Sequence, residues 1–285
     1  MCCNMDNSSR TTSQKTIHIT LFAVASLVLL FTPSASAWKT HPKPKWSGDR
    51  IPPHRLLPNN AVTQRKIVTY HNFFRSRAQP PASDMLRMRW HKGAAKSAQR
   101  WAEQCLMLTH DNATGRWDEH FGSCGQNIFI STMQVAWLFA IKTWHAERDN
   151  FTYGSNDNDI HVVGHYTQMI WSTSHRVGCG FARCRTPAYM GSKVYYSYVC
   201  NYCPIGNFLD RLGRPYKKGK PCDSCPNSCH AKRLCTNSCP RSDLWVNCGE
   251  LATTWHSWLC NNKSPEGRKR RQHCRATCGC KNRLF

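Results

Sequence analysis

Apolar side chains recur at two different spacings along the middle of the chain. Spacings of three and four residues predict amphipathic helices. The clearest helix spans residues 67–78, with Ile67, His71 and Phe74 on one face, and stops before Pro80. Three further helices are expected, within 90–110, over 134–149 and, as a short element, over 166–171.

A period of two residues marks the strands. In the segment KVYYSYVCNY, the large side chains of Val194, Tyr196 and Tyr198 alternate with smaller or polar ones. Strands are expected over 126–130, 176–184 and 193–202. Because helices and strands are interspersed, the first domain is predicted to be α+β or a three-layer sandwich.

Composition changes on both sides of this domain. Residues 38–60 contain five prolines and are basic, which predicts a linker or extended arm and not a packed element. Residues 213–235 have almost no apolar side chains outside their cysteines. Such a segment cannot bury a core, so its own disulfides must hold it.

The N-terminal residues have the pattern of an export signal. An apolar run over 17–31 follows Arg10 and Lys15, and Ala35-Ser36-Ala37 supplies the small residues of a cleavage site. A signal peptide over residues 1–37 and a secreted, extracellular protein are therefore expected. The alternative is an uncleaved anchor, which the shortness of the apolar run disfavours.

The cysteines agree with export. Of eighteen cysteines, Cys2 and Cys3 fall in the predicted signal peptide, and the even remainder is typical of a disulfide framework. Their pairing does not follow from composition. Zinc binding through Cys222 and Cys225 is the alternative, and an oxidising compartment makes it the weaker one.

The net charge is +23, which draws the chain to anionic surfaces. Sulfated glycans, anionic lipid and acidic channel vestibules are the extracellular candidates. Nucleic acid is not expected as a partner of an exported chain, and membrane contact is expected to be peripheral at most. For any single lysine or arginine, a solvated surface position remains the simplest interpretation.

Several motifs occur in one order along residues 61–285. They are HNFFR (71–75), Trp144-x-x-Glu147, GHYTQMIWS (164–172) and CNYCPIGNF (200–208). Together with the cysteine spacing they resemble the cysteine-rich secretory proteins of the CAP superfamily. The resemblance implies a three-layer α-β-α CAP domain over 61–212, a disulfide hinge over 213–238 and a compact helical cysteine-rich domain over 239–285. The resemblance further implies that the last domain is similar to sea-anemone potassium-channel toxins and regulates ion channels.

The resemblance also implies the disulfide pairing. Three bridges belong to the CAP domain, two to the hinge and three to the terminal domain. They are Cys105–Cys184, Cys124–Cys203 and Cys179–Cys200, then Cys222–Cys229 and Cys225–Cys235, then Cys239–Cys280, Cys248–Cys274 and Cys260–Cys278.

In this family two histidines and two glutamates meet in a central cleft. The matching positions here are His110, Gln126, Glu147 and His165, so one glutamate is replaced by Gln126. Two imidazoles can hold zinc weakly, but an uncharged Gln126 compensates a dication less well than a carboxylate. Weak zinc binding by His110 and His165, with no cofactor required, and a purely hydrogen-bonded polar cluster both remain open.

A hydrolase is not expected. All sixteen remaining cysteines are assigned to bridges, and no G-x-S-x-G motif is present. A histidine–glutamate pair alone could act as base and orienter. The protein is therefore predicted to be non-enzymatic.

The terminal domain carries the densest charge. Arg268, Lys269, Arg270 and Arg271 are consecutive, and tryptophans lie nearby in sequence. The candidate partner-binding residues are Trp255, Trp258, Arg268, Lys269, Arg270 and Arg271, with a solvated or proteolytically processed loop as the alternative.

The leading functional hypothesis is a secreted protein that modulates or blocks an ion channel, or binds another cell-surface protein. A sterol or lipid carrier using a groove near Phe151 and Tyr153 is the second hypothesis. Adhesion or defence in reproduction or immunity is the third. N-glycosylation is expected at Asn112, Asn150 and Asn262, each in an N-x-S/T sequon.

Overall fold

The structure, a computed structural model, describes residue 44 and residues 46–285. The predicted signal peptide (1–37) and residues 38–43 and 45 of the predicted arm lie outside the described residues. Within the described range, no helix combines the length and the apolarity that crossing a bilayer requires.

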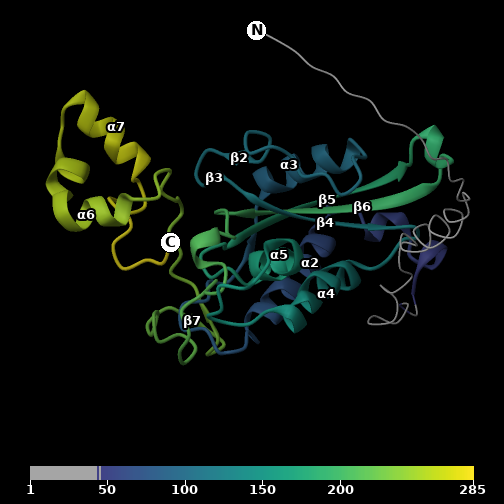
Figure 1. The fold of residues 1–285 in the computed structure, drawn as a ribbon, viewed down its shortest axis with the longest axis horizontal. Coiled ribbons are helices and arrows are strands. Elements are labelled where there is room, and N and C mark those ends of the chain that lie inside the picture. The colour runs from purple at the N-terminus through teal and green to yellow at the C-terminus, as the bar shows by residue number, and fades with distance from the viewer. Residues whose placement is uncertain (1–43, 45) are drawn as a thin grey trace, which may run out of the picture. The chain divides into compact units, whose positions relative to one another are not determined.

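A four-stranded sheet lies at the centre of the first domain, in the order β1-β5-β6-β4 (Figure 1). Strands β5 (Arg176–Arg185) and β6 (Val194–Cys203) pair antiparallel along their whole length. Strand β4 (Gly125–Ser131) pairs antiparallel with β6, and β1 (Arg89–Trp90) adds to β5 in parallel. The short pairs are β2 (Trp117–Asp118) with β3 (Gly122–Ser123), and β7 (Cys229–His230) with β8 (Leu234–Cys235).

Helix α3 (Lys92–Glu103) covers one face of the sheet at very short range. Two glycines of β5 allow this approach. A Cβ on Gly178 would lie 2.1 Å from the backbone nitrogen of Ala95, and one on Gly180 would lie 2.3 Å from Cα of Gln99. The alanines of α3 are the matching small side chains, so helix and strand pack backbone to backbone.

Three helices cover the other face: α2 (Ala61–Arg75), α4 (Trp137–Ala146) and α5 (Ile160–Ile170). The largest core cluster lies between them and the sheet and includes Ile67, Trp144 and Tyr198. The predicted α+β class and the three-layer α-β-α arrangement are confirmed. The expected helix over 166–171 is longer than the pattern indicated, because Asp159 caps it with its side chain on the backbone N–H of His161.

Residues 46–58 correct one expectation. They were expected to form an unpacked arm, but Ile51 and Leu56 are buried in the main core. Indole Nε1 of Trp137 donates to the carbonyl of Leu56 at 2.8 Å, and Ser47 bridges to Val135. The two apolar side chains and this buried indole outweigh the preference of a proline-rich segment for solvent.

The hinge is not held by disulfides alone. Its backbone pairs with residues 81–87 of the first domain: the N–H of Arg87 donates to the carbonyl of Cys235, and the N–H of Cys235 donates to Met85, each at 2.8 Å. Leu86 is fully buried beside Cys222 and Cys235. Backbone hydrogen bonds to the first domain, and the packing of Leu86 of that domain against the hinge cysteines, thus offset the low apolar content of the hinge.

The terminal region contains two short α-helices, α6 (Cys248–His256) and α7 (Pro265–His273), joined through a π-helical turn at Ser257–Asn261. Trp255 departs from helical geometry, with φ −137° and ψ 45°. The core of this terminal region is a small cluster of cysteines packed with Leu259. Such a small core needs its disulfides for stability.

Candidate functional site

The motifs GHYTQMIWS (164–172) and CNYCPIGNF (200–208) are joined by hydrogen bonds. Side-chain oxygen Oδ1 of Asn207 accepts from Thr167 Oγ1, and its amide donates to the carbonyl of Gly164, both at 2.8 Å. The backbone N–H of Gly206 donates to Gln168 Oε1 at 3.2 Å. The side chains of Thr167, Gln168 and Asn207 therefore specify how α5 packs on the loop after β6.

The HNFFR motif also bonds mainly to backbone. Arg75 is buried and its guanidinium donates to the carbonyls of Leu86, Met169, Trp171 and Ser172, at 2.7–3.0 Å. Asn72 pairs with both the N–H and the carbonyl of Met88. His71 lies between the carbonyl of Ile67 and the hydroxyl of Tyr202, and burial lowers its pKa to about 4.

His165 and Glu147 form one half of the cleft constellation. Nδ1 of His165 donates to Glu147 Oε1 at 2.5 Å. The second carboxylate oxygen, Oε2, accepts the backbone N–H groups of His165 and Tyr166 at 2.9 and 3.0 Å. The imidazole also stacks against Trp144, with 17° between the ring planes. The ring is thus fixed in place, with Nδ1 carrying its proton.

His110 and Gln126 form the other half. Gln126 Oε1 accepts from Nδ1 of His110 and from the backbone N–H of Asp111, at 2.9 and 3.0 Å. Its Nε2 donates to Oδ1 of Asn201 at 3.0 Å. Gln126 therefore uses both ends of its amide, which a glutamate could not do. Burial lowers the pKa of His110, and Arg116 and His165 lower it further.

Asn201 was not predicted as a site residue. It lies directly opposite Gln126 in the β4–β6 ladder, and its own amide donates to Ser97 Oγ at 3.0 Å. The register of two strands would have identified it, since cross-strand neighbours on one face lie in contact. The motif alone does not supply that register.

The donor set fits a weakly held metal. Both histidines have Nδ1 occupied as a donor, and among the described residues neither Nε2 has a partner. Metal-binding histidines commonly have such an outer hydrogen bond, which fixes the tautomer and leaves Nε2 free as a ligand. His110 and His165 would hold zinc through these atoms, with solvent completing the shell.

In the described chain, Cys222, Cys225 and Cys235 bring three possible metal-ligand atoms together. Their sulfur atoms all lie within 4.8 Å of one another. All three sulfurs are in disulfides, so none is a thiolate ligand. Within the described residues, the hydrogen bonds of the four cleft side chains reach no serine, threonine or cysteine. The hydroxyl of Ser97 joins this network through Asn201, one hydrogen bond beyond Gln126.

The hinge packs against one side of the groove expected near Phe151 and Tyr153. Tyr216 lies against Tyr153 with ring centroids 5.1 Å apart, and the Tyr153 hydroxyl donates to the carbonyl of Tyr216 at 2.7 Å. Phe151 packs against Tyr166 in the same cluster. The aromatic surface that would receive a lipid is used to seat the hinge.

The eight disulfides of the structure join the same pairs that the resemblance implies. Cys179 and Cys200 are directly opposite each other on β5 and β6. The three sequon asparagines, Asn112, Asn150 and Asn262, are exposed.

The structure places the six candidate partner-binding residues on more than one surface. Trp255 and Trp258 pack edge to face with centroids 5.9 Å apart, and the guanidinium of Arg270 lies 4.0 Å from the Trp258 ring. We call these three residues the tryptophan cluster. Arg268 and Arg271 line a cavity instead, and Lys269 is exposed.

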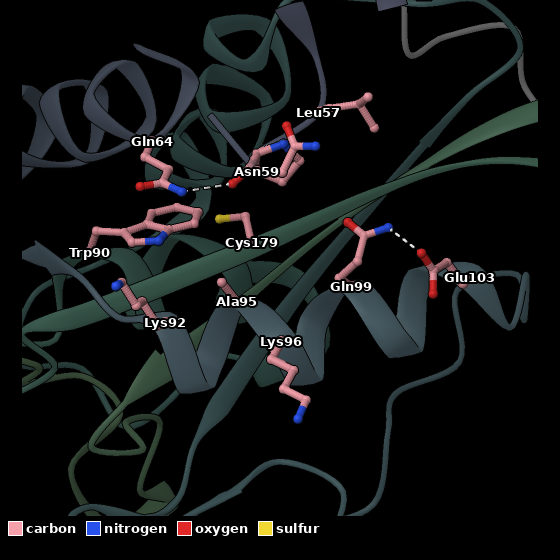
Figure 2. Close-up of a pocket in the computed structure, with 11 residues that line it drawn as sticks. Leu57, Asn59, Gln64, Trp90, Lys92, Ala95, Lys96, Gln99, Glu103 and Cys179 are labelled. Atoms are coloured by element: carbon pink, nitrogen blue, oxygen red, sulfur yellow. Dashed lines mark hydrogen bonds between the residues drawn. The ribbon is translucent and has the colours of Figure 1, made fainter. Parts of the chain in front are cut away.

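A cavity at the open edge of β5, between α3 and the start of α2, was not foreseen (Figure 2). It has a volume of about 440 Å³, and its lining includes Trp90, Cys179, Lys92 and Lys96. Nearby, Gln99 bonds both the N–H and the carbonyl of Phe181 and so caps the open edge of β5. The residues come from three distant segments, which no local pattern connects.

Comparison with known proteins gives matches over nearly all of the described chain. A model of the cysteine-rich secretory protein family (CAP) matches residues 68–202, and the Crisp model matches residues 222–285. Human cysteine-rich secretory proteins 2 and 3 are 39% and 40% identical over 231 residues, which cover 81% of this chain and 88% of each relative.

Among solved structures, the crystal structure of NaASP2 with Zn²⁺ is similar, with a TM-score of 0.51 and 28% identity. The similarity covers 62% of this chain and 96% of that one.

Proposed function

Because the chain belongs to the cysteine-rich secretory protein family, we propose that it is a secreted, non-enzymatic binding protein whose terminal domain modulates ion channels. It acts by occupying a channel mouth or vestibule. The first domain widens the contact and carries no chemistry of its own.

The observation that carries this proposal is the tryptophan cluster. Trp255 is 56% exposed and Trp258 40% exposed, although large aromatic rings are normally covered. Arg270 is held in place by its two nitrogens, Nε and Nη2, on the carbonyl of Trp258, each at 3.3 Å. The domain thus presents two rings and a cation in a fixed arrangement.

Such an arrangement suits a channel entrance. Tryptophan and arginine are the residues that most often dominate binding energy at interfaces. Channel mouths present carbonyl and carboxylate oxygens, which attract a positive surface. Three disulfides hold the domain, so little conformational entropy is lost on binding.

The cleft supports a binding protein better than an enzyme. His165 and Glu147 could orient a base, but the described contacts supply no nucleophile beside them. Zinc held by His110 and His165 would be an accessory ligand. NaASP2, a similar protein, has been crystallised with Zn²⁺.

The test is electrophysiology with the full-length secreted protein on cells expressing calcium, potassium or ryanodine-type channels. The wild type should change the current in at least one class. A Trp255→Ala, Trp258→Ala double variant should require about 10-fold more protein for the same effect. Val246→Ala is the matched control, because Val246 is 94% exposed and lies outside the cluster. No current change with the wild type in any class would overturn the proposal.

A further inference from the structure

The terminal domain has a second basic feature, distinct from the tryptophan cluster. A cavity of about 680 Å³ is lined by residues of α7 and of the segments on either side of it. We call it the arginine cavity. Its lining residues are Arg241, Leu244, Arg268, Arg271, Gln272, His273, Arg275 and Gly279.

Helix geometry explains why the basic run is divided. Successive residues of a helix turn by about 100°, so residues three apart share a face. Arg268 and Arg271 therefore face the cavity, whereas Arg270 points to roughly the opposite side and contacts Trp258. One four-residue run thus supplies cations to two different surfaces.

Two further arginines approach from outside the helix. Arg275 is held by its Nε, which donates to the carbonyl of Ser242 at 3.0 Å, while its buried Nη2 has no partner among the described residues. Arg241 is exposed and makes no side-chain hydrogen bond within the described chain. Arg268 is held on the carbonyl of Lys263.

The charges in this cavity are unbalanced. Its lining contains four guanidinium groups and no aspartate or glutamate. Burial lowers the pKa of Arg275, and the neighbouring Arg241 lowers it further. Carboxylates at Asp118, Asp243 and Glu119 act in the opposite direction. The carboxylate of Asp243 is already bonded to the backbone N–H groups of Ala276 and Thr277. A bound anion would remove the repulsion among the arginines.

We propose that the arginine cavity is a binding site for a sulfated glycan. Guanidinium groups match the geometry of sulfate oxygens and bind them with paired hydrogen bonds. The volume is in the range of sites for small organic ligands, so it admits a sugar unit together with its sulfates.

The lining also favours a sugar over a lipid. Leu244 is the one large apolar side chain among the residues of the cavity, so an acyl chain would have little to contact. Gln272 and His273 supply polar groups for sugar hydroxyls. The site does not depend on the proposed channel activity, because it shares no residue with the tryptophan cluster.

The experiment measures the affinity of the full-length protein for a size-defined heparin oligosaccharide at about 0.15 M salt. The test variant is Arg241→Ala, Arg271→Ala, since both side chains are exposed and hold no other element in place. Lys92→Ala, Lys96→Ala removes the same charge from the cavity of Figure 2 and is the matched control. We expect about 10-fold weaker binding for the arginine variant and less than about 3-fold for the lysine variant.

Three further ligands test specificity: the desulfated oligosaccharide, sodium sulfate alone and vesicles containing phosphatidylserine. The proposal expects the desulfated sugar to bind at least about 10-fold more weakly than the sulfated one. An equal loss of oligosaccharide affinity in the arginine and lysine variants would mean that overall charge attracts the ligand, and would overturn the proposal. Binding of inorganic sulfate without binding of the oligosaccharide would overturn the proposal as well. Binding of the vesicles without binding of the oligosaccharide would also overturn it. Unchanged channel modulation in the arginine variant would leave the proposed function standing.

Discussion

Single residues in this protein are constrained mostly by contact with backbone. Gly178 is the clearest example, since the backbone of α3 occupies the space where its Cβ would be. Gln126 is constrained differently, since its amide is bonded at both ends, to the side chains of His110 and Asn201 and to the backbone N–H of Asp111. Both constraints concern neighbours that are distant in sequence.

We predict that Gly178→Ala lowers the free energy of unfolding by about 3 kcal/mol or more, because the new Cβ meets backbone that cannot move aside. Gly249→Ala is the control. Its Cβ would meet nothing within 4 Å and it lies inside α6, so we expect a gain of up to about 1 kcal/mol. Urea denaturation of both variants and of the wild type measures these changes in the free energy of unfolding. Equal stability of Gly178→Ala and the wild type would refute the close packing.

Gln126→Glu should have opposite effects without and with zinc. Without zinc, the new carboxylate faces Asn201 Oδ1 and loses the donated hydrogen bond, which costs about 1–3 kcal/mol of stability. With zinc, the carboxylate should raise affinity by about 10-fold or more, since it compensates charge and orients His110. Calorimetric titration with zinc measures this, and His110→Ala should abolish the gain. Zinc affinity unchanged by Gln126→Glu would argue against the cleft as the metal site.

The motifs predicted the members of the cleft but not how they are bonded. His110, Gln126, Glu147 and His165 were identified by their positions in motifs that resemble those of the family. The structure adds that His110 pairs with Gln126, whereas His165 pairs with Glu147. Side-chain pairing of this kind depends on strand register and helix rotation, which periodicity does not determine.

At the scale of elements, the predicted helices and strands are present. The wrong predictions concern the packing of two segments, the arm and the hinge, on the first domain. The arm was expected to lack packing because residues 38–60 are basic and rich in proline, and the hinge because it has few apolar residues. Each packs on the first domain through a few side chains, Ile51 and Leu56 in the arm and Tyr216 in the hinge. Composition averages over a segment and misses such isolated anchors.

Arg75 ties three of these elements together, since it links the end of α2 to residue 86 and to the end of α5. We predict that Arg75→Met lowers the free energy of unfolding by about 3–5 kcal/mol, because four buried carbonyls each lose a hydrogen bond from a charged donor. Arg77→Met is the control. Arg77 is exposed and contacts the ring of Phe73, so its loss should cost about 1 kcal/mol or less. Thermal unfolding of both variants measures the difference, and similar losses would contradict the role given to Arg75.

For the whole molecule, buried histidines make stability depend on pH. Burial lowers the pKa of His71 and His145 to about 4 and that of His175 to about 3. In the unfolded chain each takes up a proton near pH 6.5. The unfolded state thus binds more protons below that pH, so stability is full above pH 6.5 and is lost as pH falls toward 4.

His145→Phe isolates one of these groups. His145 stacks on Phe74 and makes no side-chain hydrogen bond within the described chain, so phenylalanine should fit its site. Between about pH 6 and 4.5, the free energy of unfolding of the variant should fall less steeply, by about 1.4 kcal/mol per pH unit. Denaturation at several pH values gives the slope. A slope identical to that of the wild type would mean that His145 is protonated in the folded protein.

The order of the disulfides along the chain has a consequence for how the protein is made. The three bridges of the first domain are closed by residue 203, the two of the hinge lie within 222–235, and the three of the terminal domain lie within 239–280. A chain that folds as it is synthesised therefore presents these cysteines in the order in which they pair, as successive sets of six, four and six. No native bridge has to wait for a cysteine of a later set, so wrong pairings between sets are not needed at any stage of synthesis.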